Sequence, residues 1–283
     1  MNVTKKVITV MFALITLVLT IGVAQADLTT DIISYWKFDE NTGSTAGDSA
    51  GSNDGTITDA TWTTGKINNG LDFGTNTDNY YVSVGDTSTF AWVHQTNEFS
   101  VSVWVYLNDD DLSTQILGNN YQGVGKGFYI TKDTSNKMYF LVSHGGSSNI
   151  FLESGTLEKN KWYHVVATAD GESSTARLYI DGTQVDTDTV GATTTGDSNS
   201  NLYLGRTNRN DRFHNGLLDE PAIWSRALTA NEDLTVYNNE SNNASFWTFG
   251  AEEEASFNVT TLSAIEVSYT SAKMRGEIEN YDP

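Results

Sequence analysis

The sequence predicts an all-β fold in which two antiparallel sheets pack face to face as a sandwich, with one short C-terminal helix. Three observations predict it. Short runs rich in Val, Ile, Tyr, Phe and Trp alternate with gaps rich in Gly, Asn, Asp and Ser along most of the 283-residue chain. Two of the gaps hold Asp-Gly turns, and an Asp-Glu pair accompanies both the first and the last apolar run. We therefore expect the first and last strands to lie in one sheet system.

Nine runs are predicted as strands because β-branched and aromatic residues dominate them. They cover residues 33–38, 80–84, 99–107, 127–131, 137–143, 161–169, 174–181, 201–205 and 216–224. Alternation is clearest in 99–107, where every second residue from Phe99 to Leu107 is apolar and forms one face. That face belongs in the core between the sheets. Trp104 and Tyr106 take the opposite face, where we expect them on the outer surface of a sheet or beneath a loop.

The Asp-Gly turns predict two hairpins, and a capping box predicts the helix. Asp170-Gly171 and Asp181-Gly182 separate strand-like runs, and Gly accepts the positive φ that tight hairpin turns need. Thr229-Ala-Asn-Glu232 is a capping box followed by apolar residues, so a helix is predicted to begin at Thr229.

The first 26 residues predict a signal peptide. Lys5 and Lys6 precede an apolar run over 7–23, and Ala24-Gln25-Ala26 is a small-residue cleavage site. The alternative is a retained membrane anchor, because the apolar run is at the short limit for spanning a bilayer. We expect cleavage, and no membrane association of the chain after it.

Charge and cysteine content limit the partners and the compartment. The formal net charge is −20, and removal of the two lysines of the signal peptide would take it to −22. Such a surface repels phosphate backbones, which excludes nucleic acid as an expected partner. An exported domain without cysteine depends on its core for stability, with a bound metal as a further source. This pattern predicts a bacterial or archaeal protein that is secreted, extracellular or on the cell surface.

The sequence predicts two folded regions. We expect the sandwich to cover 27–240 and a polar, acidic linker to cover 241–256. Residues 257–283 have two strand-like runs that resemble the opening of bacterial fibronectin type III-like modules. Fewer than about thirty residues bury too little surface to form a core, so this second domain is expected to be truncated and the parent protein longer.

Several blocks of the first region occur in the order found in one known family. They are Trp-Lys-Phe-Asp-Glu at 36–40, Gly-Leu-Asp-Phe at 70–73, Lys-Trp-Tyr-His-Val-Val at 161–166, Leu-Tyr-Ile-Asp-Gly at 178–182, Leu-Tyr-Leu-Gly at 202–205 and Gly-Leu-Leu-Asp-Glu at 216–220. Together they resemble the laminin G-like domains, which are concanavalin A-like jelly rolls, over about residues 30–240. Pro221 departs from the family, which usually has Val there. Proline removes one ladder donor and predicts an edge or a bulge.

The resemblance implies a structural Ca²⁺ ion where the first and last strands meet. Asp219 occupies the acidic position that the resemblance suggests as a ligand, and Asp39 and Glu40 are its expected neighbours. Calcium takes six to eight oxygen ligands, a set that leaves no tight spacing in a sequence. The alternative is that these carboxylates make hydrogen bonds at strand ends without a metal.

The same fold houses glucanases, which makes a hydrolase the enzyme to consider. The related glucanases have Glu-x-Asp-x-x-Glu on a central strand, and this spacing does not occur in the sequence. A nucleophilic Cys is also absent from the sequence. His164 lies in the middle of a predicted strand and is expected to be packed and hydrogen-bonded. We therefore predict a non-catalytic protein, with a hydrolase whose carboxylates come from loops as the alternative.

Three loops have the mixture of residues found in carbohydrate sites. In 119–122, 144–149 and 206–212, Tyr121 would stack on a sugar, and His144, Asn208, Arg209 and Asp211 would supply polar contacts. The alternative is that these are ordinary solvated loops. The predicted function is a binding module for a glycan or another extracellular ligand. Adhesion through partner proteins without a sugar site is the competing hypothesis, and the oligomeric state is not predicted.

Overall fold

The computed structural model describes residues 28–241 except 76, 109–111, 121–124, 146–147 and 199, and it leaves the side chains of 148 and 149 undescribed. The predicted signal peptide over 1–26 and the fibronectin-like region over 257–283 lie outside the described residues. So does the predicted linker over 241–256, apart from its first residue, Ser241. These remain predictions.

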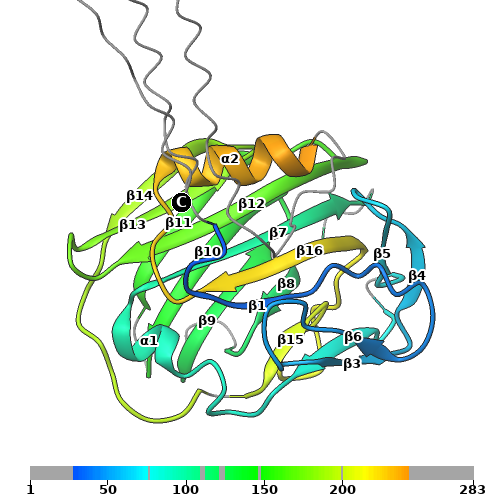
Figure 1. Ribbon diagram of the computed structural model, residues 1–283, viewed down its shortest axis with the longest axis horizontal. Helices are drawn as coiled ribbons and strands as arrows, with labels where there is room; N and C mark the ends of the chain where they lie inside the picture. The colour runs from blue at the N-terminus through cyan, green and yellow to red at the C-terminus, as the bar shows by residue number, and fades with distance from the viewer. Residues whose placement is uncertain are drawn as a thin grey trace, which may run out of the picture. The chain divides into compact units, whose positions relative to one another are not determined.

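Two eight-stranded antiparallel sheets form the sandwich, as predicted (Figure 1). The first sheet has the order β14 (Thr183–Thr189), β13 (Thr175–Ile180), β12 (Lys161–Asp170), β7 (Phe99–Leu107), β16 (Gly216–Trp224), β5 (Asn69–Asp72), β4 (Thr61–Thr64), with β1 (Ile32–Tyr35) also paired to β16. The second sheet has the order β11 (Ser148–Thr156), β10 (Lys137–His144), β9 (Lys126–Lys132), β8 (Thr114–Gly118), β15 (Leu202–Leu204), β6 (Tyr81–Val84), β3 (Gly55–Thr58), β2 (Thr45–Ala46).

The core lies between the inner faces of the two sheets. Each second residue of β7, from Phe99 to Leu107, is fully buried, which confirms the predicted inward face. On the second sheet Phe128 and Phe140 are also fully buried. Their ring centroids lie 6.2 and 5.7 Å from that of Phe99, so aromatic contacts tie the layers together.

The first and last strands lie side by side, as the sequence predicted. β1 runs antiparallel to β16, and just beyond it the Trp36 N–H donates to the carbonyl oxygen of Pro221 at 3.0 Å. The register of β16 against β7 shifts between Asp219 and Ala222, and Glu220 has a positive φ of 52°. Pro221 therefore lies in a bulge of an interior strand.

The structure adds strands that the sequence pattern did not predict: β2, β3, β4, β5, β8 and β11. The first four have four residues or fewer and are rich in Thr and Gly, so their length gives no alternation to detect. In β11, Ser, Asn and Gly interrupt the apolar residues. An additional short helix, α1 (Trp92–Thr96), has only five residues and no side-chain cap.

The C-terminal helix α2 (Ala230–Ser241) is capped as predicted. The Thr229 N–H donates to Glu232 Oε2 at 2.7 Å, and the Glu232 N–H donates to Thr229 Oγ1 at 3.2 Å. Within the described residues, neither helix has the length and apolar character needed to cross a bilayer.

Helix α2 lies across the outer face of the first sheet (Figure 1). Trp104 projects outward from β7, stacks on Tyr237 of α2 at 5.8 Å, and donates from Nε1 to Glu240 at 2.7 Å. A helix, and not solvent or a loop, therefore covers Trp104. His164 is buried beside it, with Nε2 3.3 Å from Glu240, and burial lowers its pKa to about 3. The predicted packing of His164 is confirmed, whereas its ring nitrogens make no hydrogen bond to the described residues, so that part of the prediction is wrong.

Candidate functional site

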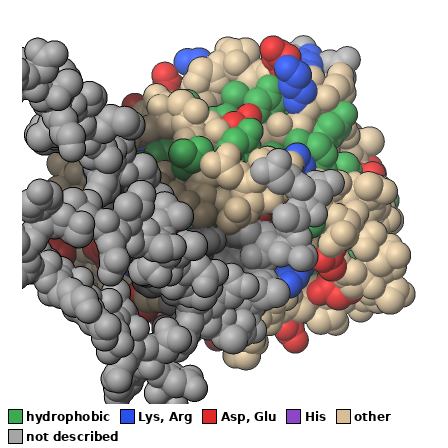
Figure 2. Space-filling view, turned by 45° about the horizontal axis from the view of Figure 1, so that its top comes forward, with side chains coloured by type: hydrophobic (Ala, Val, Ile, Leu, Met, Phe, Trp, Pro, Cys, Tyr) green, Lys and Arg blue, Asp and Glu red, His purple; other side chains and the backbone are tan. Residues whose placement is uncertain are grey.

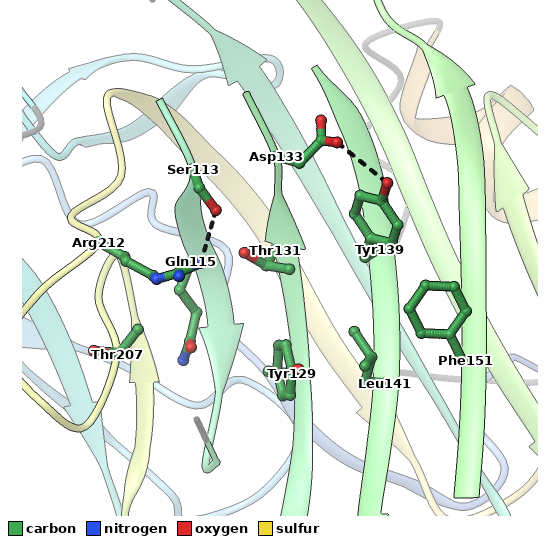
Figure 3. Close-up of a pocket in the computed structure, with 10 residues that line it drawn as sticks. All are labelled: Ser113, Gln115, Tyr129, Thr131, Asp133, Tyr139, Leu141, Phe151, Thr207 and Arg212. Carbon is green, nitrogen blue, oxygen red and sulfur yellow. Dashed lines mark hydrogen bonds between the residues drawn. The ribbon is translucent and has the colours of Figure 1, made fainter. Parts of the chain in front are cut away.

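A pocket of about 200 Å³ opens on the outer face of the second sheet (Figure 3). Its floor spans four strands, β8 to β11, and consists of Gln115, Tyr129, Thr131, Tyr139, Leu141 and Phe151. Its rim comes from the segments next to them and comprises Ser113, Asp133, Thr207 and Arg212.

Strand alternation explains why these side chains face outward. In β9 the core residues Phe128 and Ile130 flank Tyr129 and precede Thr131, so Tyr129 and Thr131 point away from the core. The register then aligns the outward residues across the strands. Leu141 pairs with both Tyr129 and Phe151, and this row forms an apolar strip perpendicular to the strands.

The strip is exposed to solvent at its Phe151 end. At its Tyr129 end the next position in the row has no side chain. Phe151 is 46% exposed, and its ring centroid lies 5.6 Å from that of Tyr139. Beyond Tyr129 the next position in the row is Gly118. A Cβ atom there would lie 2.4 Å from the Cβ of Tyr129 and 2.6 Å from the Phe128 carbonyl oxygen, so a side chain does not fit at this point of the floor.

Hydrogen-bonding groups surround the apolar strip. The Tyr139 hydroxyl donates to Asp133 Oδ2 at 3.1 Å. Burial and the carboxylates of Asp133 and Glu153 raise the pKa of Tyr139 to about 12, so its hydroxyl stays protonated at neutral pH. Asp133 Oδ1 also accepts the backbone N–H groups of Ser135 and Lys137. The carboxylate is thereby fixed at the turn between β9 and β10.

The loop between β15 and β16 supplies the opposite rim. The Gln115 N–H donates to the Arg212 carbonyl at 2.9 Å, which ties the loop to β8. Arg212 Nη1 donates to Ser113 Oγ at 2.8 Å. Earlier in the loop, the Arg206 guanidinium lies 3.6 Å from the ring centroid of Tyr81 and 4.4 Å from that of Tyr203. Arg206 therefore occupies the faces of the next outward aromatic residues on the sheet.

The structure brings the predicted sugar-binding loop 206–212 to this pocket, where Thr207 and Arg212 line it. Asn208, Arg209 and Asp211 belong to the same loop, and the Thr207 hydroxyl donates to the carboxylate of Asp211. His144 lies at the end of β10, beyond the lining residue Leu141, and burial and His94 lower its pKa. Tyr121 lies outside the described residues.

Sequence reasoning missed the aromatic floor. Its signal was present for two strands, because Tyr129 and Tyr139 occupy outward positions in runs that were predicted correctly. The pairing of the runs was not available from the sequence, and β11, which carries Phe151, was not predicted as a strand. The floor becomes visible only when the strand order and the register are known.

The predicted metal site at the first and last strands brings Asp219, Glu220 and Asp39 into electrostatic range of one another. Asp219 is fully buried, and its two carboxylate oxygens accept the backbone N–H groups of Ile67 and Glu220 at 2.9 and 3.0 Å. Glu220 accepts the Tyr35 hydroxyl. Burial and the neighbouring charge of Glu220 raise the pKa of Asp219. Burial raises that of Glu220 to about 8, with Asp39 adding to the rise.

This cluster does not match the ligand set that Ca²⁺ prefers. Asp39 lies beside it but accepts hydrogen bonds from Asn68 and Asn69, and Glu40 accepts the Gly47 N–H at 2.8 Å. Within the described part of the chain, no group of three or more acidic or histidine side chains is placed to hold a metal ion. The donors present satisfy the carboxylates without a cation, and calcium binding stays a prediction.

Comparison with known proteins places this geometry in a family. The model of the concanavalin A-like lectin/glucanases superfamily matches residues 73–232, which is more than half of the chain. No curated protein matches the chain.

Several solved structures share the fold. Trypanosoma rangeli sialidase, in complex with 2,3-difluorosialic acid, has a TM-score of 0.57 and 17% identity, over 76% of this chain and 34% of that chain. Domain 4 of the extracellular arabinanase AbnA from Geobacillus stearothermophilus, in complex with arabinotriose, has a TM-score of 0.54 and 20% identity, over 73% and 98%. The binding domain of botulinum neurotoxin DC, in complex with SialylT, has a TM-score of 0.58 and 15% identity, over 75% and 52%.

This chain thus spans about a third of the length of the sialidase and nearly all of the arabinanase domain. At these identities the structural likeness concerns the fold alone. The chain belongs to the concanavalin A-like lectin/glucanases superfamily, as the match over residues 73–232 shows.

Proposed function

We propose that this member of the superfamily is a non-catalytic glycan-binding module and that the pocket over β8 to β11 is its binding site. The observation that supports the proposal best is the outward-facing strip of Tyr129, Leu141 and Phe151, which is buried at Tyr129 and Leu141, exposed at Phe151, and bordered by hydroxyl, amide, carboxylate and guanidinium groups. Small-molecule sites combine an apolar surface with a few placed polar groups in this way.

The chemistry of a sugar matches both parts of the pocket. One face of a pyranose ring carries C–H groups that pack on an aromatic ring, and its hydroxyls both donate and accept hydrogen bonds. Phe151 offers an exposed ring surface beside the buried ring of Tyr129. In the adjacent row the hydroxyl of Thr131 donates to the Thr114 carbonyl and can still accept a hydrogen bond, and the amide of Gln115 lies buried at the base of the pocket. An oligosaccharide that lies across the strands would meet both rows at once.

The fold neighbours support carbohydrate as the ligand class. The arabinanase domain is described with arabinotriose and the neurotoxin domain with SialylT. For the present chain, this shared fold and the aromatic strip together favour a glycan over a partner protein, which remains the alternative.

The carboxylates at the pocket favour binding over hydrolysis, because hydrogen bonds and an ion pair already engage them. A hydrolase needs one carboxyl group free to protonate the leaving group and another free to attack or to activate water. Asp133 accepts hydrogen bonds from two backbone N–H groups and from Tyr139, and Glu153 forms an ion pair with Lys137 at 3.3 Å. The raised pKa of Tyr139 also makes its hydroxyl a poor nucleophile.

We also propose that the module acts outside the cell, as a secreted or surface-displayed protein. The support is the predicted signal peptide over 1–26 and the acidic, cysteine-free composition. Release of the mature chain into the medium of an expressing cell, with cleavage after Ala26, tests this part.

The experiment for the glycan site combines a glycan array with two matched variants of the full chain. Phe151→Ala removes an exposed ring from the pocket, and Leu234→Ala removes a side chain of similar exposure (43%) from α2, on the other sheet. Phe151→Ala is expected to lower the affinity for the retained glycan about tenfold or more, while Leu234→Ala leaves it unchanged.

Three outcomes would contradict the proposal. If no glycan is retained and the protein binds itself or other proteins, the adhesion alternative is favoured. If both variants lose affinity equally, the site lies elsewhere. Release of reducing ends from a polysaccharide would show that the chain is an enzyme.

A further inference from the structure

We infer that the pocket selects neutral oligosaccharides and discriminates against sugars that carry carboxylates. The inference rests on the proposed function, and it concerns the chemical class of the ligand. Its basis is the hydrogen bonds and ion pairs of Asp133, Glu153, Lys137 and Arg212 at the pocket, together with the net charge of the whole protein.

The floor of the pocket is uncharged. Gln115, Thr131 and Tyr139 supply an amide and two hydroxyls, and the remaining floor residues are apolar or aromatic apart from the hydroxyl of Tyr129. Amides and hydroxyls both donate and accept hydrogen bonds, as sugar hydroxyls do. A carboxylate only accepts, so it would leave the acceptor atoms of the floor without partners.

The two acidic groups at the pocket lie on the same side of it. Asp133 and Glu153 both act on the Tyr139 hydroxyl, which places negative charge at this end of the floor. An anionic sugar entering here would lose hydration next to like charges, an unfavourable arrangement in a partly desolvated site.

The cations at the pocket are already engaged. Lys137 pairs with Glu153 at 3.3 Å, and Arg212 donates to Ser113 at 2.8 Å. Further along the sheet, Arg206 lies over Tyr81 and Tyr203 and also donates to Asn79 at 3.0 Å. An anionic ligand would have to break such contacts to gain a positive partner, whereas a neutral ligand leaves them intact.

The electrostatic field of the whole protein also disfavours anionic ligands. The formal net charge is −20, and acidic side chains are spread over the face visible in Figure 2. A strongly negative surface slows the approach of anions and lowers their local concentration at low ionic strength. Long-range and local electrostatics therefore both favour a neutral ligand.

The test uses the same polymer with and without carboxylates. Soluble galactan, mannan and mixed-linkage β-glucan, each in native form and after oxidation of C6 to a carboxylate, are compared by affinity electrophoresis with the full chain. We expect at least one native polymer to bind and its oxidised form to bind about tenfold or more weakly, with a smaller difference at 0.5 M salt than at 0.05 M.

Charge variants identify the source of the discrimination. Glu153→Gln is expected to recover binding of the oxidised polymer several-fold without weakening the native one, and Asp133→Asn is expected to raise the ratio of oxidised to native affinity several-fold. Glu172→Gln removes one exposed acid from the loop between β12 and β13 on the other sheet, and it serves as the matched charge control. Circular dichroism confirms that each variant is folded.

The outcomes separate this inference from the proposed function. If oxidised polymers bind as tightly as native ones or more tightly, and Phe151→Ala abolishes that binding, the pocket binds glycans but the neutral preference is overturned. If neither form of any polymer binds, and sialyllactose and oligogalacturonate also fail, the glycan site itself is refuted. Equal recovery in Glu172→Gln would overturn the local role of Asp133 and Glu153.

Discussion

The outer faces of the two sheets both carry outward-facing aromatic residues, but a helix packs over one face and a pocket opens on the other. On the first sheet, Trp104 and His164 project outward from adjacent strands and are buried under Tyr237 and Glu240 of α2. On the second sheet, Tyr129, Tyr139, Leu141 and Phe151 project outward from adjacent strands and line an open pocket. We call these the covered face and the open face.

The difference shows that an outward-facing aromatic residue on a sheet can be covered by another element of the same chain or can remain available to a ligand. What packs against it determines whether it contributes to stability or to binding. On the covered face the partner is a helix of the same chain, so the aromatic residues contribute to stability. On the open face no helix of the described residues lies over the strip, and its Phe151 end is 46% exposed; we propose that a ligand binds there. Mutations on the two faces should therefore separate stability from binding.

The largest effect is expected from Trp104→Ala on the covered face. The side chain is 2% exposed, stacks on Tyr237 and donates to the buried Glu240, so its removal leaves a cavity and takes one hydrogen bond from a buried carboxyl group. We expect the free energy of unfolding to fall by about 3 to 5 kcal/mol, measured by urea denaturation. Glycan affinity of the folded fraction should not change.

Truncation of an aromatic side chain on the open face is expected to have a much smaller effect on stability. Phe151→Ala is expected to lower the free energy of unfolding by less than about 1 kcal/mol, because nearly half of the ring is already exposed. A loss of stability for Phe151→Ala as large as that for Trp104→Ala would show that both faces are structural and would break the comparison.

The second effect is a loss of stability as pH rises, and it originates in the first sheet and its helix. Asp233 of α2 is fully buried, neither of its carboxylate oxygens has a hydrogen-bond partner within the described part of the chain, and burial raises its pKa to about 7. Burial likewise raises the pKa of Glu220 to about 8, with Asp39 adding to the rise and Tyr35 and Lys37 opposing it.

The sign follows from proton linkage. Unfolded carboxyl groups titrate near pH 4, so between about pH 4 and pH 8 Asp233 and Glu220 bind more protons in the folded state than in the unfolded state, and they outweigh the opposite contribution of His164, whose pKa burial lowers to about 3. The free energy of unfolding therefore decreases as pH rises through this window, by at least about 2 kcal/mol between pH 5 and pH 8. Asp233→Asn should make the decrease smaller, and Leu234→Ala on the same helix should leave it unchanged. A free energy of unfolding that increases from pH 5 to pH 8 would refute the burial of these acids.

A smaller effect is expected at the edge where the two sheets meet. Asp188 of β14 accepts the Phe151 N–H at 2.9 Å, and Asp186 accepts the Glu153 N–H at 2.8 Å. Each of these aspartates also accepts the N–H of the residue that follows it. They therefore satisfy donors on both edge strands, β11 and β14, which would otherwise be available for pairing with another chain.

We expect Asp188→Ala to lower the free energy of unfolding by about 1 kcal/mol and the double variant with Asp186→Ala by about 2 kcal/mol. Light scattering should show increased self-association of the double variant, because the edge of β11 becomes free. Thr187→Ala on the same strand, whose hydroxyl donates to Ala176 within the first sheet, is the matched control. Identical behaviour of the control would assign the effect to β14 itself.

The sequence predicted the sandwich well, because its long strands carry a two-residue period and its first and last strands carry matching motifs. β7 and β16 have the predicted bounds, and Pro221 lies in a bulge, one of the two positions predicted for it. The candidate site was harder, because a floor made of single residues from four strands depends on strand order and register. Alternation alone could not distinguish Trp104, which a helix covers, from Tyr129, which remains in a pocket.

The smallest effect is expected from calcium. The oxygens of Asp219 accept two backbone N–H groups, and Glu220 accepts the hydroxyl of Tyr35, so the donors of the fold already occupy the positions that a cation would need. We expect 1 mM EDTA or 5 mM Ca²⁺ to shift the melting temperature at pH 7 by less than about 1 °C, equivalent to less than about 0.5 kcal/mol. A saturable rise of several degrees with Ca²⁺, lost in Asp219→Asn, would establish the metal site that the family resemblance implies. Binding would then have to release these hydrogen bonds, and it would also flatten the loss of stability with pH, because a cation stabilises ionised carboxylates.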